Sequence, residues 1–510
     1  MKFINLTLFF MMCVASLSFG QESTIGIFEQ ANDVGSPANK GTSSYDPANQ
    51  VYTLKGAGYN IWFNRDEFHF LHNSIKGDFI LTANFEFVGQ GVDPHRKIGW
   101  MVRESLEEEA SHISATLHGD GLTVLQWRAL RGAYMRDPED QFFSPKSNYS
   151  ILQVERKGKL IIMRAAHWGE PLQLIGSKEM KHFGDEIFAG LFICSHNADV
   201  VEEAHIWNVR IDKPVGEDYN PGQSGWLGCR METMNVFNGK RKVIHESDGR
   251  FEAPNWMPDG KKLLFNMDGS IYMIPVEGGI LEKLNTGVAT SNNNDHGISF
   301  NGKILAISSS HRSDLDGGGS AIYVLPLEGG EPKLITGKTP SYWHGWNPNN
   351  KELVYVAKRD ENKPYNIYSA DIKIGQETQI TSFEFGHVDG PEFSPDGKYI
   401  YYNGSQSGTM QIWRMKPDGT GNEQLTFNQY NNWFPHISPD GKWIAYISFP
   451  EDIPVDSHPS YKRVTLNLMP IYGGPAKVVA YLYGGQGTIN VPSWSPDSKH
   501  IAFVSNSGRK

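Results

Sequence analysis

Histidines recur near one position of a segment that is repeated in the second half of the chain. Six copies of a turn related to Pro-Asp-Gly-Lys have their third residue at 260, 302, 350, 397, 441 and 498. The residue six places earlier is proline in four copies, but it is His296 and His344 in two neighbouring ones. His436 follows this position by one residue in a third copy, and His387 lies just ahead of it in a fourth. Four imidazoles from four repeats are therefore expected to gather in one place.

Carboxylate and amide side chains accompany these histidines. Asp295, Asp389 and Glu392 lie in the same segments, and Gln486 lies in a glycine-rich run before the last copy. Imidazoles combined with carboxylate or amide oxygens suit a first-row divalent ion such as Mn²⁺, Zn²⁺ or Fe²⁺. We therefore expect a divalent metal here. The three carboxylates are expected to orient the imidazoles by hydrogen-bonding their other ring nitrogens. The alternative is that the histidines only hydrogen-bond backbone groups.

The spacing between copies predicts the elements that must position these residues. Steps of 42, 48, 47, 44 and 57 residues match the period of a four-stranded propeller blade. In each copy a short apolar strand meets the Pro-Asp-Gly turn, which favours a hairpin, and further strands follow. The inner strand of every blade starts near one mouth of the central channel, so the histidines are expected to share that mouth.

The two ends of the repeat region predict how the ring closes. The last copy, at 491–505, supplies only two strands, and the missing outer two lie upstream at 230–238 and 241–246. A blade built from both ends leaves no open sheet edge. We expect a six-bladed β-propeller at 226–510, closed by this composite blade.

These repeats resemble the TolB-like (PD40 repeat) propeller family, whose blades carry the same Pro-Asp-Gly-Lys turn. The resemblance implies the fold, but that fold hosts binding scaffolds and enzymes alike. The propeller is also distantly similar to oligogalacturonate lyases, which bind a divalent metal through histidines and a glutamine and cleave uronate oligosaccharides by β-elimination. That similarity implies one metal-binding set at the channel mouth: His296, His344, His387, His436 and Gln486.

The chemistry that the resemblance implies is the removal of the C5 proton of a uronic acid. A metal on the carboxylate stabilises the negative charge that develops. A neutral histidine is a suitable base, and Arg312, in a loop of the second blade, is a candidate to hold a carboxylate or sulfate. We therefore predict an enzyme acting on acidic oligosaccharides, with His296, His344, His387 and Arg312 as catalytic residues.

The reaction type stays open at this point. Expelling a glycosidic oxygen would make the enzyme a lyase, and expelling water would make it a dehydratase. Asp295, Asp389 and Glu392 could instead be the paired carboxylates of a glycoside hydrolase. The remaining alternative is a non-catalytic TolB-like scaffold that binds a protein or a glycan in the channel.

The first part of the chain carries no propeller repeat. Residues 22–215 read as alternating strands separated by Gly, Asp and Asn turns, which favours a two-sheet jelly roll. The segments FHFLHNSIKGDFILTANFEFVG and GLFICSHN resemble concanavalin-like sandwich domains, which accompany secreted carbohydrate-active proteins. The Pro- and Gly-containing stretch 216–225 is the expected linker.

The N-terminus and the composition bound the protein's location and partners. Residues 1–20 read as a signal peptide, too short to span a membrane, so we expect a periplasmic or secreted protein without membrane insertion. The net charge of −10 and the absence of a basic tract argue against nucleic-acid binding. Cys194 and Cys229 are expected to be buried free thiols, with one bridge between the domains as the alternative. A monomer is expected.

Overall fold

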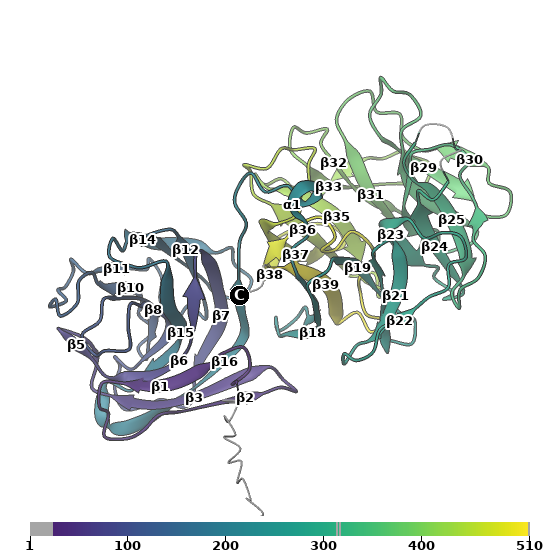
Figure 1. Ribbon diagram of the computed structural model, residues 1–510. Coiled ribbons are helices and arrows are strands. Elements are labelled where there is room, and N and C mark those ends of the chain that lie inside the picture. Colours follow the sequence, from purple (N-terminus) through teal and green to yellow (C-terminus); the bar gives the residue numbers. More distant parts are fainter. Residues whose placement is uncertain (1–23, 313–314, 316–317, 508–510) are drawn as a thin grey trace, which may run out of the picture.

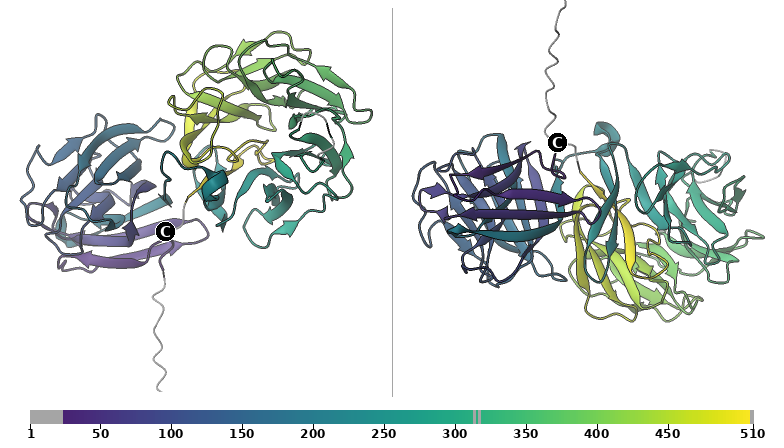
Figure 2. Two further views of the ribbon diagram at one scale, coloured as in Figure 1. Left: turned by 45° about the horizontal axis from the view of Figure 1, so that its top comes forward. Right: turned by 90° about the horizontal axis from the view of Figure 1, so that it is seen from below.

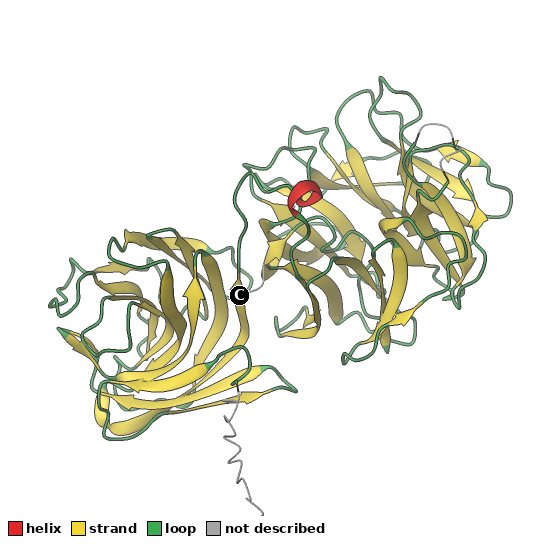
Figure 3. Ribbon diagram, in the orientation of Figure 1, coloured by secondary structure: helices red, strands yellow, loops and turns green. Residues whose placement is uncertain are grey.

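The structure is a computed structural model that describes residues 24–312, 315 and 318–507, and the predicted signal peptide lies outside these residues. Strands make up almost all of the regular structure, with one short helix, α1 (Pro221–Ser224) (Figure 3). In the described ranges no helix is long and apolar enough to cross a membrane. The predicted all-β fold class is therefore confirmed.

The N-terminal domain is a sandwich of two seven-stranded sheets (Figure 1). The first sheet has the order β1 (Gln30–Val34), β6 (Phe68–Lys76), β15 (Glu186–Cys194), β8 (Lys97–Arg103), β9 (His112–His118), β10 (Thr123–Arg128) and β11 (Gln141–Phe143). The second has the order β14 (Gln173–Glu179), β13 (Leu160–Ala166), β12 (Ile151–Lys157), β7 (Phe79–Phe87), β16 (Asn197–Asp212), β3 (Val51–Gly58) and β2 (Thr42–Asp46). A small hairpin joins β4 (Ile61–Trp62) to β5 (Arg65–Asp66).

Alternating apolar residues of both sheets form one core between them. Trp100 of β8 is fully buried there, and its indole N–H donates to the carbonyl of Leu152 on the opposite sheet (3.2 Å). Because the polar N–H is satisfied, this tryptophan can fill the core without a desolvation cost.

The C-terminal domain is a ring of six sheets around a common axis (Figure 2). Five of them are four-stranded antiparallel blades, written here from the inner strand outward. The first two blades are β19 (Phe251–Trp256), β20 (Lys262–Met267), β21 (Ser270–Pro275) and β22 (Glu282–Lys283), then β23 (Asn292–Ile298), β24 (Ile304–Ser309), β25 (Ala321–Pro326) and β26 (Lys333–Leu334). The third and fourth are β27 (Ser341–Trp346), β28 (Glu352–Ala357), β29 (Asn366–Asp371) and β30 (Glu377–Gln379), then β31 (Val388–Phe393), β32 (Ile400–Gly404), β33 (Gln411–Met415) and β34 (Glu423–Gln424). The fifth is β35 (Asn431–Ile437), β36 (Trp443–Phe449), β37 (Lys462–Pro470) and β38 (Lys477–Gly484).

The sixth blade is built from both ends of the propeller, as predicted. Its sheet has the order β18 (Arg241–Ser247), β17 (Cys229–Asn235) and β39 (His500–Asn506). The expected innermost strand at 491–495 makes only an isolated bridge, between Trp494 and Ile501. The ring is therefore closed mainly by the seven-residue register between β17 and β39.

Ending the chain at residue 490 is expected to prevent soluble folding, because it removes β39 and exposes the edge of β17. A chain that ends at 507 keeps all of β39 and is the control. Size-exclusion chromatography and denaturant unfolding would report the difference. A monomeric, cooperatively unfolding 1–490 protein would contradict closure by the composite blade.

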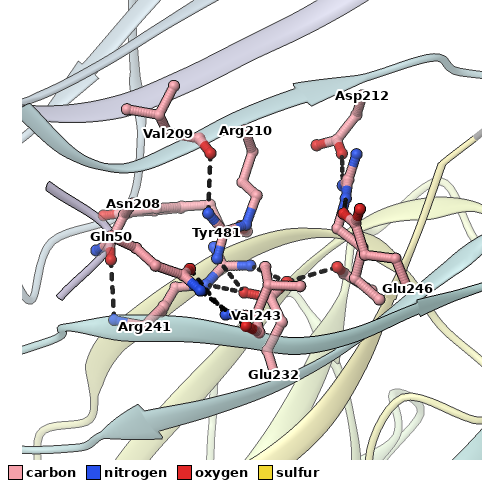
Figure 4. A network of polar contacts seen from close by, with 12 residues as sticks. Gln50, Asn208, Val209, Arg210, Asp212, Glu232, Arg241, Val243, Glu246 and Tyr481 are labelled. Carbon is pink, nitrogen blue, oxygen red and sulfur yellow. Dashed lines mark hydrogen bonds and ion pairs between the residues drawn. The ribbon is translucent and has the colours of Figure 1, made fainter. Parts of the chain in front are cut away.

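The two domains are joined by buried polar contacts (Figure 4). Glu232 of β17 accepts from Arg210 of the sandwich strand β16 (2.6 Å) and from Arg241 of β18 (2.8 Å). The side-chain amide of Gln50 both accepts from the backbone N–H of Val243 (3.0 Å) and donates to its carbonyl (2.7 Å). The amide thereby covers part of the outer edge of β18.

Neither cysteine takes part in this interface as a disulfide. Cys194 and Cys229 are both buried free thiols. Burial raises the pKa of Cys194 to about 11 and that of Cys229 to about 12. Both thiols therefore stay protonated at neutral pH. Because both are free in the structure, they do not form the alternative bridge between the domains.

Candidate active site in the propeller cavity

One mouth of the propeller contains a cavity of about 660 Å³. Side chains from the inner strands of several blades line it, together with Trp226 from the linker between the domains, which in the structure spans residues 213–228 between β16 and β17. The lining is rich in groups that hydrogen-bond and titrate, and these are Asn266, Asn293, Asn294, Asp295, Tyr342, His344, Tyr365, His387, Asp389, His458, Gln486 and Asn490. Such convergence of polar groups in a concave space is typical of a binding or catalytic site.

A β-bulge in every four-stranded blade decides which residues reach this cavity. The pairing of the inner strand with its neighbour shifts between Asn292 and His296 in β23, and between Trp343 and Gly345 in β27. β19, β31 and β35 have shifts at the corresponding level. A bulge adds unpaired residues and re-aims their side chains. Asp295 and His344 lie within these bulges and line the cavity.

Asp389 and His344 form the central ion pair of the site, with 2.8 Å between Oδ1 and Nε2. Burial alone would lower the pKa of His344, but the carboxylate of Asp389 outweighs that effect and raises it. Burial alone would raise the pKa of Asp389, but the imidazoles of His344 and His387 hold it well below its usual range. The contact therefore favours the imidazolium form of His344 beside the carboxylate form of Asp389.

Two further imidazoles approach the other oxygen of Asp389. The Nε2 atoms of His387 and His458 lie 3.8 and 3.9 Å from its Oδ2. The His458 ring packs edge-on against Trp433, with 4.4 Å between ring centroids. Burial lowers the pKa of His458, while Asp389 and a hydrogen bond with Gln486 only partly offset it. His458 is therefore neutral near pH 7 and can accept a proton.

Asp295 has the opposite character to Asp389. Burial raises its pKa to about 7, and repulsion from Asp389 adds to the effect, although His344 opposes it. The Asn293 amide donates to Oδ2 of Asp295 (2.9 Å) and so fixes the carboxyl group. Asp295 is therefore about half protonated at pH 7 and mostly protonated below it, while Asp389 is ionised. Two carboxyl groups whose pKa values are driven apart are typical of acid–base catalysis.

The donor atoms of this site do not form a ready-made metal centre. In the described part of the chain, no group of three or more His, Cys, Asp and Glu side chains is arranged to hold a metal ion. His344 is already bonded to Asp389 through Nε2. In this arrangement the side chains do not fit the expected divalent ion. The protein groups themselves must then supply the acid and the base of any reaction in the cavity.

Two of the predicted site histidines lie outside the cavity, which corrects the sequence-based prediction. His296 is fully buried and is the first residue after the bulge, where it pairs in register with Ile307. His436 bonds Glu392 through Nδ1 (2.8 Å) and the Ile489 carbonyl through Nε2 (2.7 Å), so both ring nitrogens are occupied.

The physical reason for both errors is the bulge. It shifts the side chains that follow it by one place, so equal sequence positions are not equal in space. Glu392 also accepts from the backbone N–H of Ile437 (3.0 Å), and with His436 it ties two neighbouring blades together. Glu392 and His436 thus contact each other and the neighbouring backbone, and they do not line the cavity.

Apart from Glu392, the structure brings together the other predicted residues with one exception. His344, His387, Gln486, Asp295 and Asp389 all line the cavity. The exception is Arg312, an exposed residue of the loop after β24 that is not among the lining residues.

The cavity is also lined by His458, Tyr342, Tyr365, Trp226 and Arg250, which the repeat-based prediction did not include. The usable signal for His458 is the connection from Phe449 to Lys462, a long loop that joins β36 to β37. Long loops at the mouth of a rigid scaffold are where functional residues concentrate.

Comparison with known proteins places this architecture in a family. Residues 344–457 match the TolB beta propeller domain. An uncharacterized protein of Agrobacterium fabrum is 45% identical over 284 residues, which are 56% of this chain and 94% of that protein. The solved structure of a putative TolB from Agrobacterium tumefaciens is 43% identical and has a TM-score of 0.52, covering 56% of this chain and all of that one.

An oligogalacturonate lyase in complex with manganese is a more remote neighbour. It is 14% identical with a TM-score of 0.35, covering 58% of this chain and 79% of that one. Independently of that neighbour, the strand order shows that the site is carried by a six-bladed propeller that follows an N-terminal sandwich. The chain belongs to the TolB-like β-propeller family.

Proposed function

We propose that this protein is an exported carbohydrate-active enzyme that acts on uronic-acid-containing oligosaccharides by β-elimination in the propeller cavity. The observation that carries the proposal is that one polar cavity is lined by both an acid whose pKa is raised to about 7, Asp295, and a neutral imidazole, His458. Elimination needs both at once, since a base must remove a C–H proton while an acid protonates the departing oxygen.

In the proposed reaction, His458 removes the proton on C5 of the uronate, and Gln486 holds its ring in place. The electrons form the C4=C5 double bond as the C4–O bond breaks, and Asp295 donates its proton to the leaving oxygen. Negative charge that develops on the substrate carboxylate is stabilised by the cationic His344. A glycosidic leaving oxygen makes the enzyme a lyase, and a hydroxyl makes it a dehydratase.

The expected result of an assay on uronate oligosaccharides is new ultraviolet absorbance from the unsaturated product. The rate should be bell-shaped in pH: it falls above about pH 7, where Asp295 loses its proton, and at low pH, where His458 gains one. His458→Gln should lower kcat about 100-fold or more, because it removes the base. Full activity of this variant, with an unchanged acid limb, would contradict the role of His458.

Parallel assays with Mn²⁺ and with a chelator, alongside metal analysis of the purified protein, test the divalent-ion hypothesis.

Glycoside hydrolysis is the second candidate, because Asp295 and Asp389 are two carboxyl groups with opposite protonation states. It predicts release of reducing sugar without ultraviolet absorbance. The similarity to a putative TolB favours a third candidate, a non-catalytic scaffold. It predicts no turnover of any acidic saccharide and a peptide or glycan that co-purifies.

A further inference from the structure

The linker between the domains reaches the rim of the propeller cavity. In Figure 1, the linker runs from the sandwich to α1, which lies beside the propeller. The linker is anchored by Tyr461, whose hydroxyl accepts from the backbone N–H of Leu227 (2.9 Å) and whose ring lies 5.7 Å from that of Tyr219. The residue before Leu227 is Trp226, and it lines the cavity. The site is thus incomplete without the linker.

Trp226 is unlike the other tryptophans near the site. Trp343 and Trp433 are buried in the blades, whereas Trp226 is 41% exposed although it lines a cavity. The guanidinium of Arg250 lies over its indole ring, 3.6 Å from the centroid. An aromatic ring that is held in place by a cation and open to a cavity offers a flat apolar surface on which a ligand can stack.

Arg250 brings a positive charge to a cavity that is otherwise lined by carboxyl groups and neutral or histidine side chains. It is the only lysine or arginine among the described residues that line the cavity, and the carboxyl groups Glu252, Asp268, Asp295 and Asp389 line it too. Arg250 forms an ion pair with Glu252, and burial raises the pKa of Glu252. A guanidinium has five N–H donors in a planar fork, so the contact with Glu252 does not exhaust its capacity for a second carboxylate.

We propose that Trp226 and Arg250 form a subsite for an acidic sugar unit. The indole stacks on the apolar face of the sugar ring, and the guanidinium binds the ring's carboxylate. This inference rests on the proposed function and deepens it, because it assigns the selectivity for acidic over neutral saccharides to one residue. It also explains why a negatively charged protein can hold an anionic ligand, since the charge that attracts it is local.

The test is calorimetric binding of tetragalacturonate and of its neutral, carboxyl-reduced counterpart, with the full-length protein carrying Asp295→Asn to prevent turnover. Arg250→Gln should weaken binding of the acidic tetrasaccharide about 10- to 100-fold and leave the neutral one within about 3-fold. Trp226→Ala should weaken both about 10-fold, and Trp226→Phe should restore part of the loss. Arg136→Gln, at an exposed arginine of the sandwich, is the matched control.

The outcomes separate the subsite from the proposed function. Equal affinity of the acidic tetrasaccharide for the protein with and without Arg250→Gln would overturn the subsite while leaving the uronate-directed enzyme intact. Equal affinity of the acidic and the neutral tetrasaccharide before the Arg250 change would overturn it as well. Failure of the protein to bind either saccharide would overturn the proposed function and the subsite together. Unfolding curves of each variant show whether a loss of affinity reflects a loss of folding.

Discussion

Asp295→Asn is expected to abolish turnover and, at the same time, to stabilise the folded protein at alkaline pH. Asparagine has nearly the same shape and keeps a hydrogen-bonding partner for Asn293, but it has no proton to give to a leaving oxygen. Loss of a general acid costs about 100- to 10,000-fold in rate. Steady-state kinetics on uronate oligosaccharides would measure the loss.

The gain in stability follows from the sign of the pKa shift. The pKa of Asp295 is about 7 in the folded protein and 3.8 at its ordinary value. The folded state therefore keeps a proton that the unfolded state releases, and the stability contributed by Asp295 is lost as pH rises from about 4 to about 7. A shift of about three pKa units corresponds to about 4 kcal/mol. Asparagine does not ionise, so the variant should have a larger free energy of unfolding than the parent at pH 8, and an equal one below pH 4.

Asp268→Asn is the matched control for this prediction. Asp268 also lines the cavity, but it is exposed and has a positive φ of 50°, which asparagine adopts readily. Its replacement should change neither rate nor stability by much. Retained turnover in Asp295→Asn, or a stability difference that does not depend on pH, would show that Asp295 is not the buried acid of the site.

The repeat region shows why the fold could be predicted in detail. Each blade carries its own turn signal, such as Gly260 and Gly441, which both have the positive φ that glycine tolerates at low cost. Local signals of this kind agree with the global ring closure, so the blade count follows from the sequence. The innermost strand of the last blade was the exception, since 491–495 forms a single bridge where a strand was expected.

The candidate site could be predicted only in part, for a reason that is also physical. A sequence alignment of blades assumes one register, but the inner strands contain bulges of different extent. In β23 the bulge turns Asp295 toward the cavity and leaves His296 between the sheets, while in β27 His344 itself lies in the bulge. His458 comes from a loop and Trp226 from the linker, and neither segment contains a repeat from which its position could be predicted. Tertiary placement, and not local pattern, determines those positions.

The same composite blade that closes the ring also holds the sandwich in place, and one carboxylate serves both functions. Glu232 is fully buried and contacts Arg210 of the sandwich, Arg241 of β18 and Ser505 of β39. Burial alone would raise its pKa, but the two guanidinium groups hold it far below the usual range. The carboxylate is therefore ionised at all ordinary pH values. It is the carboxylate that both arginines contact, and neither arginine has much access to water.

Glu232→Gln is expected to lower the free energy of unfolding by about 3–5 kcal/mol, because it leaves two buried guanidinium groups without a counter-charge. Urea unfolding of the full-length protein would measure the loss. Proteolysis should begin in the linker 216–225, since Arg210 loses its partner across the domain boundary.

Glu246→Gln is the control. Glu246 pairs with Arg230 in the same blade, but its side chain is 63% exposed, so the change should cost at most about 1 kcal/mol. Equal losses for the two variants would show that the buried network does not join the sandwich to the ring. A large loss for Glu232→Gln alone would mean that docking of the sandwich and closure of the propeller depend on the same buried charge.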